Sequence, residues 1–146
     1  MADRITTEFL RGLPDDRRED AGAVAALVRK AAPGLKTWIW RGTLWGGTDQ
    51  TILGFGRYTQ TGRSGKTVEW FVIGLANQKA YLSLYVSAVR DGKYLAQVYG
   101  DRLGKVKIGS SSVSFRKLAD LDLDAVSQML AEAAAHPPAP AKPAEG

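Results

Sequence analysis

The stretch TVEWFVIGLANQKAYLSLYVSA, residues 67–88, decides the fold. Both halves are rich in β-branched and aromatic residues with a two-residue period, and the polar residues around Asn77 separate them, which predicts two consecutive antiparallel strands. Because alternate residues point to opposite faces, we expect one aliphatic and one aromatic sheet face. The first would carry Phe71, Ile73, Leu75, Leu82, Leu84 and Val86, and the second Val68, Trp70, Val72, Tyr81, Ser83 and Tyr85.

Residues 35–42, 51–58 and 111–115 show similar strand patterns, and helical patterns flank them on both sides. The sequence therefore predicts an α+β fold, with a mostly antiparallel sheet of about five strands and N- and C-terminal helices packed on one face. We expect a single domain over residues 1–135. Residues 136–146, rich in Pro and Ala and without periodicity, are expected to form a disordered tail.

Capping residues predict where the helices begin. Thr6 and Thr7 are expected to precede a short first helix, and Pro14 to open a longer one that closes at residues 33–34. A short helix is expected within residues 93–104. Asp122 or Asp124 is expected to cap the last helix.

Composition limits the class of protein. The chain has 146 residues, 45% hydrophobic and 24% charged, and no cysteine, which excludes disulfides and thiol chemistry. No apolar run is long enough to span a bilayer, and the N-terminus lacks the pattern of a secretion signal, so we expect a cytoplasmic protein.

Charge is divided along the chain, although the net charge is only +5. Residues 1–28 have a balance of −2, residues 29–117 of +11 and residues 118–146 of −4. The basic middle can attract a polyanion, and the acidic flanks can fold against it and neutralise part of its field.

The stretch GRSGKT, residues 62–67, resembles the end of a phosphate-binding loop. The first glycine of that motif is replaced by Gln60, and a strand pattern follows where the motif needs a helix. Residues 104–111 have both glycines but Ser110 in place of the lysine, and they too lead into a strand. We therefore expect a hairpin turn at 60–66 and a connection at 104–110.

Acidic residues cluster where the second helix begins. Asp16, Glu19 and Asp20 can offer oxygen ligands to a hard cation such as iron, or can simply offset the positive end of the helix. The acids between Asp120 and Asp124 allow the same two interpretations. The single histidine, His136, forms no pattern of nucleophile and base, so we expect no enzyme.

Aromatic residues with basic neighbours predict a binding surface on the sheet. Trp38, Trp40 and Tyr58 are expected to join the aromatic face, which is too apolar to be left bare. Loops or a second subunit in a homodimer can cover it, or it can hold a small ligand or single-stranded nucleic acid. The candidate binding residues are Trp38, Trp40, Arg57, Tyr58, Trp70, Lys79, Tyr81 and Tyr85.

Five blocks in order, residues 8–34, 39–42, 54–58, 70–86 and 103–126, resemble the YdhG-like family of small bacterial domains. The similarity is strongest at the Gly-Lys-x-Lys-x-Gly run of residues 104–109 and at KLADLDL, residues 117–123. The resemblance implies a compact α+β domain. Some members are described as frataxin-like intracellular iron chaperones, which implies ferrous iron as ligand and an iron-accepting protein as partner.

The chain departs from the family pattern at three positions. Val106 stands where histidine is common, and Ser110 and Ser112 stand where lysine and cysteine are common. The first functional expectation is therefore a non-enzymatic domain that binds a partner or small ligand, with the acidic helix face as the remaining iron site. The second is a nucleic-acid-binding module that uses the basic aromatic face.

Overall fold

The computed structural model describes residues 3–43, 49–61, 65, 67–78 and 81–136. The helices are α1 (Arg4–Arg11), α2 (Asp15–Ala31), α3 (Leu95–Tyr99) and α4 (Leu123–Ala135), with the 3₁₀ helices η1 (Gly100–Leu103) and η2 (Leu118–Asp120). The strands are β1 (Thr37–Thr43), β2 (Asp49–Thr61), β3 (Thr67–Asn77), β4 (Leu82–Val86), β5 (Val89–Arg90), β6 (Lys93–Tyr94), β7 (Lys107–Ile108) and β8 (Ser112–Phe115).

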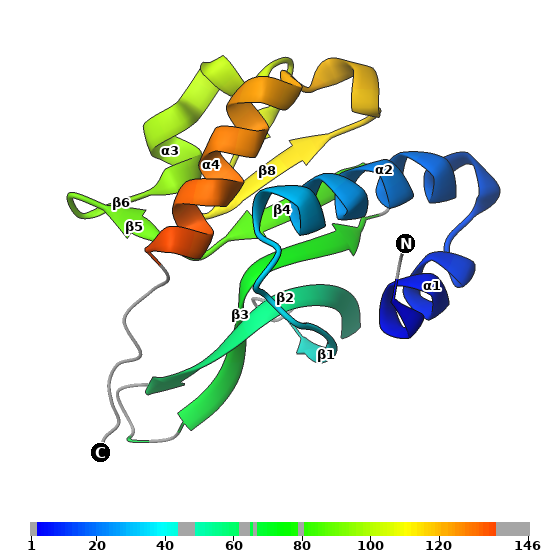
Figure 1. Ribbon diagram of the computed structural model, residues 1–146, viewed down its shortest axis with the longest axis horizontal. Coiled ribbons are helices and arrows are strands. Elements are labelled where there is room, and N and C mark those ends of the chain that lie inside the picture. The colour runs from blue at the N-terminus through cyan, green and yellow to red at the C-terminus, as the bar shows by residue number, and fades with distance from the viewer. Residues whose placement is uncertain (1–2, 44–48, 62–64, 66, 79–80, 137–146) are drawn as a thin grey trace.

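One antiparallel sheet organises the molecule, in the order β1-β2-β3-β4-β8-β7. Helices α2 and α4 lie side by side against one of its faces, and α3 lies beside α4 (Figure 1). The predicted α+β fold with the N- and C-terminal helices on one face is confirmed. The sheet has six strands rather than about five, and β5 and β6 form a separate small hairpin.

Helix α1 begins earlier than predicted. Asp3 is its N-cap, and the Asp3 carboxylate accepts a hydrogen bond of 2.7 Å from the backbone N–H of Thr6. Thr6 and Thr7 therefore lie inside the helix, and the prediction that they precede it is wrong. The same carboxylate accepts from the Thr37 hydroxyl at 2.5 Å, which ties α1 to β1.

Helix α2 follows Pro14 as predicted, and its charged N-terminal half is tied to three neighbouring elements. Arg17 donates to the Asn77 side chain at 2.8 Å, at the end of β3. Arg18 donates to the carbonyls of Leu10 and Leu13, which closes the end of α1. Asp20 accepts from the backbone N–H of Leu118 at 3.0 Å, where η2 begins.

The main hydrophobic core lies between the helices and the sheet. Its fully buried members include Val24 and Val28 of α2, Leu84 of β4 and Met129 and Leu130 of α4. Burial of this apolar surface is the main force that holds the two layers together.

The strand alternation is interrupted where Gly56 faces Val72. Gly56 has a φ of +78°, which glycine adopts easily, and no pair forms between these two residues although the register on both sides is continuous. Phe71 consequently joins the face away from the helices, while Val72 and Tyr58 pack against the helix-side core. The predicted faces of Phe71, Val72 and Tyr58 are therefore wrong.

The two glycine-rich stretches are described to different extents. Strands β2 and β3 pair antiparallel up to Thr61 and Thr67, and most of the turn predicted between them, residues 62–64 and 66, lies outside the described residues. The segment 104–110 is more than a connection, because its β7 strand pairs with β8.

No helix within the described residues is long and apolar enough to cross a membrane.

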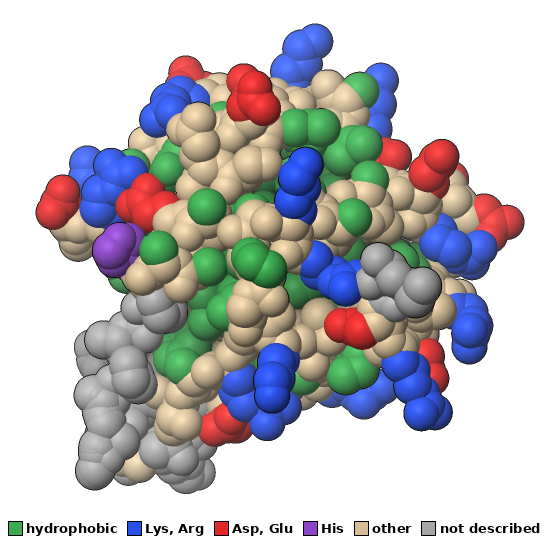
Figure 2. Space-filling view, viewed as in Figure 1, with side chains coloured by type: hydrophobic (Ala, Val, Ile, Leu, Met, Phe, Trp, Pro, Cys, Tyr) green, Lys and Arg blue, Asp and Glu red, His purple; other side chains and the backbone are tan. Residues whose placement is uncertain are grey.

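Figure 2 shows the helix side, where basic and acidic side chains are interspersed along the margin of the molecule. The expected disordered tail falls on residues 137–146, which lie outside the described residues.

Candidate anion-binding site

The sheet face away from the helices is built around two glycines. Gly54 and Gly74 face each other on β2 and β3, with Trp38 opposite Gly54 and Tyr85 opposite Gly74. A Cβ at Gly54 would lie 2.8 Å from Trp38 Nε1, and one at Gly74 would lie 2.6 Å from the Phe71 ring. The Trp38 ring therefore lies close to Gly54 and the Phe71 ring close to Gly74, where a larger residue would displace them.

The rings on this face pack against one another as a second hydrophobic cluster. The Trp40 and Trp70 ring centroids are 5.2 Å apart in an edge-to-face arrangement, and Trp70 stacks on Phe71 at 4.5 Å. The Trp70 indole N–H donates to the Ser87 hydroxyl at 3.1 Å, and that hydroxyl donates to the Phe71 carbonyl. These contacts engage the rings internally, which is the geometry of a packed core.

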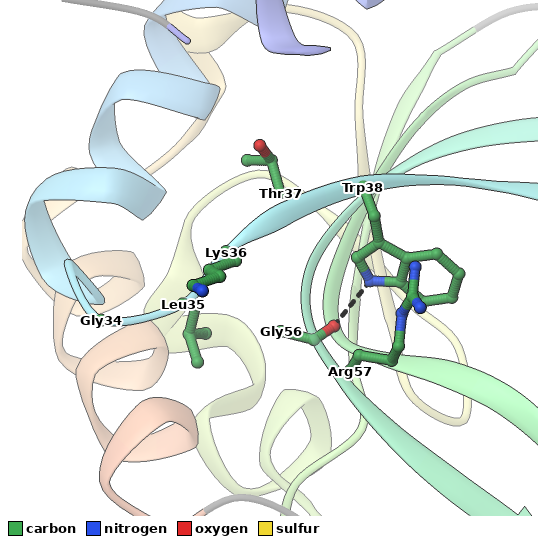
Figure 3. A pocket seen from close by; sticks show the side chains of 7 residues that line it. All are labelled: Gly34, Leu35, Lys36, Thr37, Trp38, Gly56 and Arg57. Carbon is green, nitrogen blue, oxygen red and sulfur yellow. Dashed lines mark hydrogen bonds between the residues drawn. The ribbon is translucent and has the colours of Figure 1, made fainter. Parts of the chain in front are cut away.

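Trp38 borders a hollow of about 520 Å³ beside the end of α2. Figure 3 shows the Arg57 guanidinium lying over the Trp38 indole, while the indole N–H donates to the Gly56 carbonyl. The guanidinium carbon is 4.1 Å from the ring centroid, and Arg57 also pairs with Glu69 at 3.7 Å. Arg57 thus covers the indole ring, and Gly54 lies close to its N–H edge.

The predicted ligand residues separate into three groups. Trp38, Trp40, Trp70 and Tyr85 belong to the aromatic cluster, with Arg57 over Trp38, whereas Tyr58 lies on the helix side. Burial raises the pKa of the Tyr58 and Tyr85 phenols. Tyr81 stands apart, and Lys79 lies outside the described residues.

Tyr81 lines a basic pocket of about 370 Å³ at the other end of this face. The pocket contains three cationic side chains, one carboxylate and two hydroxyl groups. Its lining residues are Tyr81, Lys105, Lys107, Ser114, Phe115, Arg116 and Asp120.

Strand pairing brings these residues together from three segments of the chain. Leu82 faces Phe115, so Tyr81 and Arg116 flank the same end of the β4–β8 pair. Lys107 faces Ser114, and Lys105 lies two residues before it, just ahead of β7. Lys105 is fixed by the hydrogen bond of 2.8 Å from its backbone N–H to the Asp120 carbonyl.

The pocket cations have no carboxylate partner in the part of the chain that the structure describes. Among the described residues, Lys105, Lys107 and Arg116 form no ion pair within 4.0 Å, although Asp120 lines the same hollow. Ser114 shares a hydrogen bond of 3.0 Å with Ser83, which is almost fully buried beneath the strand. Unpaired cations beside hydroxyl donors form a site suited to an anion.

The acidic residues proposed as iron ligands do not converge. Asp16 and Glu19 are exposed, and Asp20 is engaged by the N–H of Leu118. Asp122 caps α4 by accepting from the N–H of Ala125 at 3.1 Å. Within the described residues, no group of three or more acidic or histidine side chains is placed to hold a metal ion.

The sequence prediction included Tyr81 but missed the lysines and the arginine beside it. The only signal is the two-residue spacing of Lys105 from Lys107 and of Ser114 from Arg116, which in a strand would place each pair on one face. The pairing of β7 with β8 was needed to bring the two pairs of residues together.

No family of known proteins, no curated protein and no solved structure matches this chain. The resemblance to the YdhG-like family therefore stays a prediction, as do the expected single domain and the cytoplasmic location.

Proposed function

We propose that this protein is a non-enzymatic binding module that holds an anionic ligand in the basic pocket on the helix-free face of its sheet. The observation that carries the proposal is the gathering of Lys105, Lys107 and Arg116 without a carboxylate partner within 4.0 Å among the described residues. Because like charges repel, an anion that binds among them relieves this repulsion and accepts charge-assisted hydrogen bonds.

The aromatic cluster has a different role in this proposal. Arg57 lies over the Trp38 ring, and Trp70 is stacked and hydrogen-bonded within the protein. Exposed stacking surfaces are what a nucleic-acid platform needs. The cluster therefore supports the sheet, and the ligand binds beside it rather than on it.

Ferrous iron, an iron-accepting partner and a homodimer through the aromatic face stay predictions. No contact between described residues favours the iron site, since Asp20 is already used by η2 and Asp16 and Glu19 are exposed. An anaerobic titration with ferrous iron, with magnesium as the comparison, tests the iron-binding hypothesis separately from the anion pocket.

The test of the proposal is a titration of the full chain with pyrophosphate, followed by nitrogen-15 NMR. We expect saturable shifts of the amides of residues 81, 105–107 and 114–116. The variant Lys107→Gln should weaken binding about tenfold, since a charge-assisted hydrogen bond contributes roughly 1.5 to 3 kcal/mol. Lys93→Gln, an exposed lysine on β6, is the matched control and should bind normally. Titration without saturation, or shifts spread evenly over all basic residues, would refute the proposal.

A further inference from the structure

We infer that the ligand of the basic pocket is a small phosphate monoester that carries a planar ring, with its phosphate among Lys105, Lys107 and Arg116 and its ring against Tyr81. This inference rests on the proposed function and names the ligand class of the same site. Charge, hydroxyl donors, a free aromatic ring and the size of the hollow support it.

The charge of the pocket matches a terminal phosphate. Two lysines and one arginine against Asp120 leave a balance of +2 among the lining residues. A phosphate monoester carries a charge of about −1.5 to −2 near neutral pH, because its second pKa is about 6. A phosphodiester carries a single negative charge, so it would leave one of the cations uncompensated.

Hydroxyl groups add donors to the same site. Ser83 is buried and Ser114 is half-buried, and their oxygens are 3.0 Å apart. When the Ser83 hydroxyl donates to Ser114, the Ser114 hydroxyl is free to donate toward the pocket. Phosphate oxygens accept several hydrogen bonds, and this donor lies beside Lys107, its cross-strand neighbour.

Tyr81 offers an exposed aromatic surface. Tyr81 is 37% exposed as a residue, and it lines the pocket together with the three cations. An aromatic ring stacks on a flat ligand ring, and stacking of this kind contributes roughly 1 to 3 kcal/mol per nucleic-acid base.

The described part of the face provides room for one ring rather than a row of them. The nearest aromatic side chain along β4 is Tyr85, which is buried and accepts a hydrogen bond of 3.1 Å from the Gln78 side chain. The tryptophans beyond it are engaged in the aromatic cluster, and Arg57 is already paired with Glu69. The volume of about 370 Å³ also falls at the small end of ligand pockets, which span roughly 300 to 1,000 Å³.

Four probes test the ligand class on the full chain by the same NMR titration: adenosine monophosphate, ribose phosphate, adenosine and a short oligodeoxyadenylate without terminal phosphates. We expect adenosine monophosphate to bind about tenfold more tightly than ribose phosphate or adenosine, since the phosphate and the ring each contribute. The oligonucleotide should bind no better than adenosine.

Variants of Tyr81 separate ring stacking from folding. Tyr81→Leu should lower the affinity for adenosine monophosphate to that for ribose phosphate, and should leave ribose phosphate binding unchanged. Tyr81→Phe, which keeps the ring, should retain most of the affinity. A loss with both variants, or equal losses for both probes, would overturn the assignment of the ring to Tyr81.

The outcomes distinguish this inference from the proposed function. Pyrophosphate or ribose phosphate binding as tightly as adenosine monophosphate would overturn the planar-ring ligand while the anion pocket stands. Tighter binding of the unphosphorylated oligonucleotide would overturn it in favour of a nucleic-acid strand. No binding of any phosphate compound, pyrophosphate included, would refute both.

Discussion

At the scale of single residues, Gly104 links the fold to the basic pocket. Its backbone φ of +118° is one that residues with a side chain rarely adopt, and a Cβ there would lie 2.2 Å from the Asp120 carbonyl oxygen. This close approach lets the backbone of Gly104 form an antiparallel β-bridge with Leu121. It also lets the backbone N–H of Lys105 donate to the Asp120 carbonyl. The glycine therefore positions the segment that carries the pocket lysines.

We expect Gly104→Ala to lower the free energy of unfolding by about 3 kcal/mol, from backbone strain and steric overlap together. Urea denaturation measures the change. Gly34→Ala is the control, because no atom lies within 4 Å of a Cβ at that position. Equal effects of the two substitutions would show that the contact between Gly104 and Asp120 is not tight. Pyrophosphate binding should weaken in the folded Gly104→Ala protein as well.

Glu132 joins α4 to the β5–β6 hairpin and to α3. Its carboxylate accepts two hydrogen bonds of 2.7 Å from Arg90 and one of 2.9 Å from the Tyr99 hydroxyl. The hydrogen bonds from Arg90 are the main reason that the pKa of Glu132 falls from 4.5 to about 2. The same pairing raises the pKa of Arg90.

A lowered carboxyl pKa predicts how stability depends on pH. The contribution of Glu132 is complete above its ordinary pKa of 4.5 and is lost as the pH falls toward about 2, because the unfolded chain then binds the proton first. The difference in unfolding free energy between the wild type and Glu132→Gln should therefore shrink as the pH falls from about 5 to 2. Thermal melts across this range measure it, and a difference independent of pH would contradict the assignment. Glu8→Gln, which breaks an exposed pair with Arg4, should have little effect at any pH.

At the scale of elements, the sequence predicts strands well where their apolar alternation is regular. The two-residue period of 82–86 correctly separates Leu82, Leu84 and Val86 from Ser83 and Tyr85. It fails between Phe71 and Ile73, because the positive φ of Gly56 on the neighbouring strand interrupts the pairing. The two-residue strands β5, β6 and β7 were also missed, since so short a segment has no detectable period.

The aromatic cluster depends on the absence of a side chain at Gly74. A Cβ there would lie 2.6 and 2.8 Å from atoms of the Phe71 ring and 2.9 Å from Ile52. We expect Gly74→Ala to lower the unfolding free energy by about 2 kcal/mol, the usual cost of overpacking a core. Gly22→Ala in α2 makes only an ordinary contact of 3.5 Å with Leu10, and should instead stabilise by up to about 1 kcal/mol. Chemical denaturation of both variants tests whether the two changes in unfolding free energy have opposite signs. A Gly74→Ala protein more stable than the wild type would contradict the tight packing of Phe71 and Ile52 around Gly74.

At the scale of the whole molecule, the binding pocket could not be predicted from sequence in the way that the fold could. Its residues come from positions 81, 105–107 and 114–120, which only the β4-β8-β7 order brings together. Hydrophobic periodicity is a local signal and predicts elements, whereas the order of strands depends on long-range pairing. Trp40 and Trp70 stand out in the sequence, but their rings pack against each other and against Phe71.

The distribution of charge over the molecule predicts which lysines matter for binding. The basic middle of the chain carries +11, but acidic flanks fold against parts of it, as Glu132 does against Arg90. Tyr81 precedes β4, whose five residues span about 17 Å, and the β5–β6 hairpin that carries Lys93 lies at the other end of this strand (Figure 1). At 0.15 M salt the Debye length is about 8 Å, so a charge at that distance is largely screened.

Pyrophosphate binding by Lys107→Gln and Lys93→Gln should therefore differ in how it depends on salt. Near 0.15 M salt we expect about a tenfold loss for Lys107→Gln and no loss for Lys93→Gln. Near 0.01 M, where the Debye length grows to about 30 Å, Lys93→Gln should show a small loss, because the distant charge then contributes to the field at the pocket. Calorimetric titrations at both salt concentrations measure these losses. Equal losses for the two variants at 0.15 M would mean that the anion responds to the overall charge of the protein and not to a pocket.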